Sequence, residues 1–242
     1  MRLDVYLSEN GYAKSRTEAK NLIISGAVII QGKNVTKPSY ELSELVTDIK
    51  VDKSNFRYVS RGGLKLEAAI TEFKISAVEK NCVDIGASSG GFTDCLLQNG
   101  ASRVFAVDSG SMQLVDTLRK DARVSFKENF NARYMDTADF DTELQLAVMD
   151  VSFISATHII PRVYDVLQKG ADFVCLIKPQ FEVGRDKIGK GGIVKNEKAR
   201  IKALTDVIEF AKQTGFKFIA YIVSPIVGGD GNIEYLAHFK KP

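Results

Sequence analysis

The sequence has few of the residues that build disulfide frameworks or zinc sites. It contains three cysteines, Cys82, Cys95 and Cys175, and two histidines. An odd number of widely spaced cysteines does not match a disulfide framework, and without a neighbouring histidine cluster we expect no bound metal. Each cysteine lies in an apolar stretch, which favours a buried thiol in a reducing compartment.

Long apolar runs and a strong charge of one sign are also missing. No segment approaches the roughly 20 apolar residues that span a bilayer. The first residues are charged from Arg2 onward and lack the apolar core of a secretion signal. Because the net charge is only +3, any nucleic-acid surface must come from a local cluster of basic residues. We therefore expect a cytoplasmic protein that has no membrane partner and for which a monomer is sufficient.

The first 55 residues predict a small domain. Residues 1–55 contain two short helical patterns and a few short strand patterns, too little for a large core, so we expect a compact α+β appendage. The first helix should end at Asn10 and Gly11, and Ser15 should begin the second, with Glu18 at the capping-box position. The expected strands are 27–30, 35–36 after a turn at 31–34, and 48–51.

The remainder of the chain alternates strands and helices. After a linker at residues 56–61, a second domain at 62–242 carries seven apolar runs separated by amphipathic stretches. This pattern predicts an α/β fold with a doubly wound, mostly parallel sheet. A Gly-rich link without a helix joins the last two strands, which predicts an antiparallel hairpin. The expected strands are 82–85, 103–107, 124–127, 146–151, 171–177, 216–223 and 233–238. The expected helices are 64–73, 92–99, 112–118, 156–168 and 197–214.

A glycine-rich turn follows the first strand of the second domain, at the edge where such sheets bind ligands. The spacing Gly86-x-x-x-Gly90-Gly91 differs from the dinucleotide fingerprint, and no lysine follows as a P-loop requires. Asp84, inside the strand end, would repel a pyrophosphate but suit an ammonium group. Asp108 ends the next strand, where it could accept hydrogen bonds from ribose hydroxyls. S-adenosyl-L-methionine has a ribose, a cationic amino-acid end and no phosphate, so it fits best.

Other interpretations of this region stay open. The glycines could form a tight strand-to-helix turn without a ligand, which Asp84 and Asp108 together make less attractive. Asn129 and Asn131 could reach the adenine or simply cap a turn. We expect the cofactor to be bound by Asp84, Gly86, Ala87, Ser88, Gly90, Gly91, Phe92, Asp108 and Asn131.

Four charged residues adjoin the ends of core elements. Lys65 opens the helix before the first strand, Asp150 and Lys178 each follow an apolar strand, and Glu234 begins the last one. Charges there are costly to bury unless they are paired, so a cluster of two lysines and two carboxylates would satisfy all four. Such a cluster would perturb the pKa of one lysine and make it a general base for a hydroxyl that attacks a methyl group. Singly, Lys65 and Glu234 could instead be solvated surface charges.

The segment after the fourth strand bears on the methyl acceptor. Amino-group methylation uses a loop of the Asn/Asp-Pro-Pro-Tyr type, whereas this strand ends in Asp150, Val151, Ser152 and Phe153. We therefore favour oxygen over nitrogen as the acceptor.

These motifs resemble those of the FtsJ-like ribose 2′-O-methyltransferases, which have a Rossmann-like class I fold and a Lys-Asp-Lys-Glu tetrad. By motif position the tetrad is Lys65 in SRGGLKL, Asp150 in MDVSFIS, Lys178 in LIKPQFE and Glu234 in GNIEYL. The resemblance implies that Lys178 is the general base. It also implies that Asp150 and Lys65 orient this base and hold the hydroxyl, with Glu234 in support.

The first domain is similar to the S4 RNA-binding domain over nearly its full length. An S4 domain followed by this methyltransferase resembles the TlyA (haemolysin A) family along almost the whole chain, with a departure at Tyr58, where members often have Trp. The resemblance implies methylation of cytidine 2′-hydroxyls in ribosomal RNA of one or both ribosomal subunits. A membrane-active haemolysin and an RNA-binding protein without catalysis are the alternatives.

Basic residues of the first domain and of one later segment form candidate RNA surfaces. Ser15 could meet a phosphate at the start of the second helix, although the set could also be a solvated helix face. The Gly-rich basic segment 181–194 predicts a mobile lid that contacts RNA. We expect RNA contacts from Arg2, Lys14, Ser15, Arg16, Lys20, Lys33, Arg185, Lys187 and Lys190.

Overall fold

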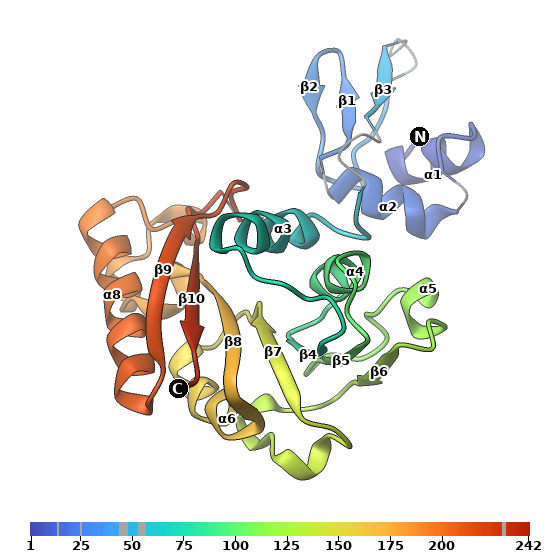
Figure 1. Cartoon of the computed structure of the whole chain (residues 1–242). Coiled ribbons are helices and arrows are strands. Elements are labelled where there is room, and N and C mark those ends of the chain that lie inside the picture. The colour runs from blue at the N-terminus through green and yellow to red at the C-terminus, as the bar shows by residue number, and fades with distance from the viewer. Residues whose placement is uncertain (14, 25, 44–47, 53–56, 229–230) are drawn as a thin grey trace. The chain divides into compact units, whose positions relative to one another are not determined.

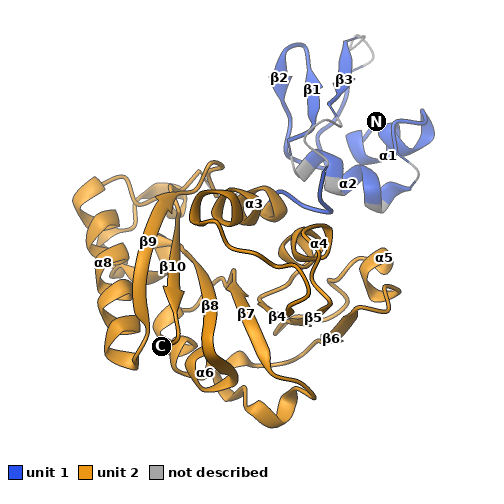
Figure 2. Ribbon diagram, viewed as in Figure 1, with its two compact units in different colours: residues 1–61 blue, residues 62–242 orange. Residues whose placement is uncertain are grey.

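The computed structural model describes residues 1–13, 15–24, 26–43, 48–52, 57–228 and 231–242. The chain falls into two compact units, Met1–Arg61 and Gly62–Pro242 (Figure 2). The boundary follows Arg61, so the described part of the expected linker, residues 57–61, groups with the first unit. Lys14, one of the expected RNA contacts, lies outside the described residues.

The first unit combines two helices with a small antiparallel sheet. Helices α1 (Leu3–Glu9) and α2 (Arg16–Ile24) pack against each other and share a core with β1 (Val28–Ile30). Strand β1 pairs with β2 (Lys33–Asn34) on one side and with β3 (Ile49–Val51) on the other. At the start of α2, the Ser15 hydroxyl accepts a hydrogen bond from the amide of Glu18 at 3.2 Å. Ser15 therefore caps this helix, as its sequence position predicts.

The second strand of this sheet begins earlier than expected. Gln31 and Gly32 have φ angles of 48° and 74°, so two left-handed residues complete the turn between β1 and β2. Ile30 consequently pairs directly with Lys33. The prediction of a strand at 35–36 is wrong, and Lys33 lies on a strand rather than on the turn.

The second unit contains a mostly parallel sheet. Among the described residues seven strands follow the order β6-β5-β4-β7-β8-β10-β9, and β10 runs antiparallel to both neighbours. The strands from β6 to β8 are parallel, and the antiparallel β9–β10 pair confirms the expected hairpin. The bounds are β4 Asn81–Ile85, β5 Arg103–Val107, β6 Val124–Lys127, β7 Leu144–Met149, β8 Leu167–Ile177, β9 Lys217–Val223 and β10 Tyr235–Lys240.

Helices cover both faces of this sheet. Helices α3 (Gly62–Phe73) and α4 (Gly91–Gln98) pack together on one face, whereas α6 (Ile160–Val166) and α8 (Glu197–Thr214) cover the other (Figure 1). Alternate strand residues such as Phe173 and Cys175 face the α6 and α8 side and are fully buried. All three cysteines are buried free thiols. This arrangement directs the carboxyl ends of the parallel strands to one edge of the sheet.

Two helices are shorter than the sequence pattern suggests. The expected helix 112–118 is reduced to α5 (Asp116–Arg119), because the amides of Met112, Gln113 and Leu114 donate to the Glu128 carboxylate instead of forming a helical turn. The expected helix 156–168 is divided into the 3₁₀ helix η4 (Ala156–His158) and α6, and β8 already begins at Leu167.

Candidate active site

The glycine-rich turn between β4 and α4 lies against the end of β7. Gly86 has a φ of 83°, and a Cβ at this position would collide with the carbonyl oxygen of Asp150. Glycine is therefore required both for the left-handed backbone and for the close approach of the two loops. Gly90, with a φ of 97°, instead leaves room for the side chains of Leu114 and Leu118. Its role is to let the α5 region pack under the turn.

Asp84 places a buried negative charge behind this turn. Its side chain has no solvent exposure, and its Oδ2 accepts a hydrogen bond from the Thr93 hydroxyl at 2.7 Å. Its Oδ1 has no hydrogen-bond partner in the described part of the chain. Burial, with smaller contributions from the charges of Asp150 and Asp108, raises the pKa of this carboxyl to about 7. An ionised Asp84 would therefore be stabilised by a cationic ligand beside the turn.

Asp108 joins two loops at the neighbouring strand end. Its Oδ2 accepts from the Ser88 amide at 2.8 Å, and its Oδ1 accepts from the Gly110 amide at 2.7 Å. Each carboxylate oxygen retains a lone pair. Asp108 can thus hold the rim of a pocket and still accept a hydroxyl hydrogen bond.

A pocket of about 650 Å³ opens at this edge of the sheet. This volume lies in the range of about 300–1,000 Å³ that small-molecule sites have. Of the residues predicted to bind the cofactor or catalyse, the lining includes Gly86, Ser88, Asp108, Asn131 and Asp150. Asn131 also caps the 3₁₀ helix η2 (Ala132–Tyr134) by accepting from the Arg133 amide at 3.1 Å, so both interpretations of this asparagine have support. The predicted cofactor residues Asp84, Ala87, Gly90, Gly91 and Phe92 do not line the pocket.

The four charged residues form two ion pairs. Lys65 Nζ lies 2.6 Å from Glu234 Oε2, and Lys178 Nζ lies 2.6 Å from Asp150 Oδ1. The hydroxyl of Ser152 also accepts a hydrogen bond from Lys178 at 2.8 Å. Because Tyr235 pairs with Ile177 in the β8–β10 register, the residues that precede and follow them, Glu234 and Lys178, are neighbours. The pattern of charges at strand ends therefore predicted a real cluster, with Glu234 placed just before β10.

A turn that was not predicted supports Glu234. A Cβ at Gly228 would collide with the Glu234 carboxylate, so a larger residue there would displace this carboxylate. The fully buried Asn232 accepts from the Val194 amide and donates to the Gly192 carbonyl, both at 2.9 Å. Asn232 thereby connects the segment before β10 to the basic segment 181–194. That segment contains the 3₁₀ helices η5 (Arg185–Lys187) and η6 (Lys190–Gly192), and its mobility stays a prediction.

Phe153 is a second residue that the sequence reasoning did not single out as a site. It is 92% exposed and has a φ of 64°, which is unusual for a bulky residue. Its ring contacts that of Phe181 at 5.3 Å between centroids. A second, open pocket of about 470 Å³ adjoins the first and shares Arg133, Phe153 and Ile154 with it. The position of Phe153, three residues after Asp150, was the available signal.

The predicted RNA contacts are exposed where they are described. The two arginines Arg2 and Arg16 both pair with the buried Asp4, at 2.9 and 3.1 Å. The hydrogen bond from Arg2, followed by that from Arg16, lowers the pKa of Asp4 to about 2 despite its burial. The remaining exposed contacts are Ser15, Lys20, Lys33, Arg185, Lys187 and Lys190.

Two other kinds of site are absent from the described residues. No group of three or more His, Cys, Asp or Glu side chains in this part of the chain could hold a metal ion. None of the described helices combines the length and the apolar character that a membrane crossing requires.

Comparisons with known proteins agree with both units. Residues 58–241 match the family of FtsJ-like methyltransferases, and residues 1–45 match the S4 domain. Hemolysin A of Brachyspira hyodysenteriae is 46% identical over 240 residues, covering 99% of each chain. The 16S/23S rRNA (cytidine-2'-O)-methyltransferase TlyA of Mycobacterium tuberculosis is 38% identical, covering 97% of this chain and 87% of the relative.

A solved structure gives the same relationship in three dimensions. The structure titled "Putative hemolysin from Streptococcus thermophilus" superimposes with a TM-score of 0.80 at 43% identity, covering 100% of this chain and 88% of the other. Full-length sequence similarity and the shared fold therefore agree. The chain belongs to the FtsJ-like methyltransferases of the TlyA (hemolysin A) family, in which an S4 domain precedes the methyltransferase domain.

Proposed function

We propose that this protein is an S-adenosyl-L-methionine-dependent enzyme that methylates the 2′-hydroxyl of cytidine ribose in ribosomal RNA. The observation that carries this proposal is the Lys178–Asp150 pair at the edge of the glycine-turn pocket, with the Lys65–Glu234 pair as its neighbour. The specificity for cytidine comes from the M. tuberculosis relative, whose name states that substrate.

The pocket has the chemistry that this cofactor needs. Asp84 does not line the pocket, but its carboxylate lies behind the turn with one oxygen that has no partner among the described residues, and its negative charge suits a cationic amino-acid group there. Asp108 would accept from the ribose hydroxyls, and Asn131 would approach the adenine from the rim. When bound, the cofactor supplies a methyl group on a sulfonium, which is already an activated leaving group.

The residues of the chain then have two tasks, to orient the acceptor hydroxyl and to remove its proton. Lys178 would first release its own proton to solvent and then take the hydroxyl proton at Nζ, while Asp150 and Ser152 fix the position of that nitrogen. Lys65, held by Glu234, would hold the ribose oxygen on the other side. Positioning of this kind supplies much of the rate enhancement when the leaving group is already activated.

The exposed Phe153 gives the acceptor nucleoside a binding surface. Nucleobases stack on aromatic side chains, and a base must leave its helix to bring its ribose to a recessed site. Phe153 and Phe181 flank the open pocket next to the first one, and Arg133 lines both. We assign this second pocket to the acceptor cytidine.

The test of this function is methyl transfer from labelled S-adenosyl-L-methionine to purified ribosomal subunits. Lys178→Ala should lower kcat by about 100-fold or more, because general base catalysis is typically worth 10²–10⁴. Lys178→Arg should be equally inactive, since a guanidinium stays protonated and cannot accept the proton. Mass spectrometry of digested RNA would locate the methyl group.

The matched control is Lys202→Ala. Lys202 is an exposed lysine on α8 that forms an ion pair with the exposed Asp206. This variant should retain wild-type activity, and all variants should bind the cofactor with similar affinity. Undiminished labelling by Lys178→Ala would refute the base assignment, and a methyl group on a nucleobase would refute the ribose assignment.

A further inference from the structure

The turn that carries Phe153 is strained and is fastened at both ends. Phe153 has a φ of 64°, an unfavourable backbone conformation for a bulky residue. Such a conformation persists in proteins only where surrounding contacts impose it. Before Phe153, Asp150 and Ser152 bind Lys178 at 2.6 and 2.8 Å. After it, Ser155 and Ala156 are held by a carboxylate that the reaction chemistry leaves unused.

That carboxylate belongs to Glu182, the last residue of α7 (Pro179–Glu182). Glu182 Oε2 accepts from the Ser155 hydroxyl at 2.6 Å, and its Oε1 accepts from the Ala156 amide at 2.8 Å. Both carboxylate oxygens of a half-buried side chain are thus directed at one turn. Phe181, the residue before Glu182, contacts the Phe153 ring from the same helix.

The contacts with the Phe153 turn made by Lys178, Phe181 and Glu182 all come from one short stretch of chain. Lys178 is the residue that precedes α7, and Pro179 restricts the backbone at the start of that helix. The distance between Lys178 and the turn at Phe153 is therefore set by a stiff five-residue unit. A shift of Glu182 would change the direction of the Phe153 ring without removing any group that touches the reacting atoms.

We propose that Glu182 is a positioning residue that clamps the Phe153 turn, so that the acceptor base stacks at a fixed distance from Lys178. This inference rests on the proposed function, because it assumes that Phe153 receives the acceptor base. The clamp explains why a large apolar ring stays exposed in a strained conformation instead of folding against the protein.

The experiment compares Glu182→Ala with Glu182→Gln in the full-length protein. The alanine variant should lower kcat/KM for ribosomal subunits by about tenfold, since misplacement of a stacked base has effects of this order. Its Kd for S-adenosyl-L-methionine should stay within about twofold of wild type. The glutamine variant can still accept from Ala156 and bond to Ser155, so it should restore most of the activity. The matched control is Glu209→Ala, which removes an exposed ion pair with Lys212 on α8.

Two further measurements separate positioning from a general structural role. In Phe153→Ala protein, adding Glu182→Ala should cause no further loss, because both changes remove the same platform. Hydrogen exchange of the Ala156 amide should accelerate in Glu182→Ala, while exchange in β4 and β7 stays unchanged. Fully additive losses, or equal losses of cofactor affinity and methyl transfer, would overturn the proposal.

The outcome also distinguishes this proposal from the proposed function. Active wild-type enzyme combined with an unimpaired Glu182→Ala variant would overturn the clamp alone. Wild-type protein that binds the cofactor but methylates no ribosomal RNA would overturn the proposed function, and the clamp with it.

Discussion

Asp84 is the residue whose protonation should control cofactor binding. Its pKa is raised to about 7, chiefly by burial, so near neutral pH it is only partly ionised before the cofactor binds. A cationic ligand favours the ionised form, and protonation of Asp84 competes with binding below pH 7. We expect the Kd for S-adenosyl-L-methionine to fall by up to about tenfold between pH 6 and pH 8 and then to level off. Isothermal titration calorimetry across this pH range would measure the Kd.

Asp84→Asn supplies the control for this prediction. The amide cannot ionise, so its affinity should be weaker and nearly independent of pH. The pH dependence of folding stability has the opposite sign. Between about pH 4 and pH 7, Asp84 keeps its proton in the folded protein without cofactor but has lost it in the unfolded chain. The free energy of unfolding therefore falls as pH rises through this range. An equally steep pH dependence in Asp84→Asn would assign the effect to another group.

Some contacts of the candidate site could be anticipated from the sequence and others could not, for a physical reason. Lys65, Asp150, Lys178 and Glu234 could be found because charges beside apolar strands need partners. The pairing of Lys65 with Glu234 depends on contacts across 169 positions of the chain and leaves no local pattern. Glu182 was missed because the groups that donate to it, in Ser155 and Ala156, lie 27 and 26 positions away and leave no local pattern in the sequence.

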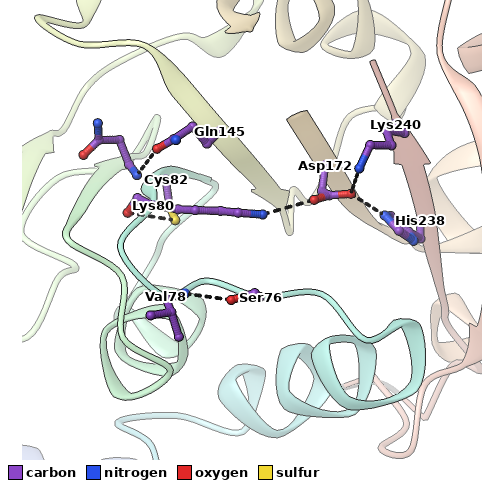
Figure 3. A network of polar contacts seen from close by, with 9 residues as sticks. Ser76, Val78, Lys80, Cys82, Gln145, Asp172, His238 and Lys240 are labelled. Atoms are coloured by element: carbon purple, nitrogen blue, oxygen red, sulfur yellow. Dashed lines mark hydrogen bonds and ion pairs between the residues drawn. The ribbon is translucent and has the colours of Figure 1, made fainter. Parts of the chain in front are cut away.

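At the scale of elements, a polar network on Asp172 fastens the sheet away from the candidate site (Figure 3). The Asp172 carboxylate accepts from Lys80, which precedes β4, at 3.2 Å and lies 3.0 Å from His238 Nε2 on β10. Lys240 adds a third contact at 3.4 Å. Burial favours the neutral acid, but the contacts with His238, Lys80 and Lys240 outweigh it and lower the pKa of Asp172 to about 2.

Asp172→Asn should therefore destabilise the fold with little effect on chemistry. Its carboxylate stabilises the folded state above pH 3.8, and this contribution disappears as pH falls toward 2. We expect the free energy of unfolding at pH 7 to drop by about 2 kcal/mol, and the difference from wild type to shrink near pH 3. Urea denaturation followed by circular dichroism would measure both values.

An exposed pair gives the comparison for that change. Asp165 binds Arg162 on the surface of α6 with about half of each side chain exposed, so Asp165→Asn should alter stability by less than about 0.5 kcal/mol. If the two variants lose the same stability, or if the loss caused by Asp172→Asn is as large at pH 3 as at pH 7, the assigned network is not what stabilises this edge.

Most elements followed from the sequence, because buried parallel strands are apolar runs and the helices between them are amphipathic. The exceptions arise from local backbone contacts and conformations. Residues 112–114 bind the Glu128 carboxylate and are lost to the helix expected there. In the first unit, Gln31 has a left-handed backbone conformation, which closes the hairpin early. Glutamine rarely adopts this conformation, so the early turn was not expected. Neither event can be seen in hydrophobic periodicity.

At the scale of the whole molecule, we propose that the first unit binds RNA and the second carries out catalysis. Asp4 has no solvent exposure, and it holds Arg2 and Arg16 with their side chains 45% and 53% exposed. Because these two guanidinium groups are exposed and held by one buried carboxylate, we propose that their remaining donors bind RNA phosphates. The second unit contains the pockets and all four tetrad residues.

This division predicts the kinetic signature of Arg16→Ala. Loss of one phosphate contact should raise KM for ribosomal subunits severalfold and reduce the slope of log Kd against log salt by about 1. At saturating subunit concentration kcat should remain near wild type, and the cofactor Kd should not change, because Arg16 belongs to the other unit. Removing an equal charge from the second unit with Lys202→Ala should leave KM and the salt slope unchanged. If Arg16→Ala instead lowers kcat at saturation, the first unit does more than capture RNA and must take part in forming the catalytic site.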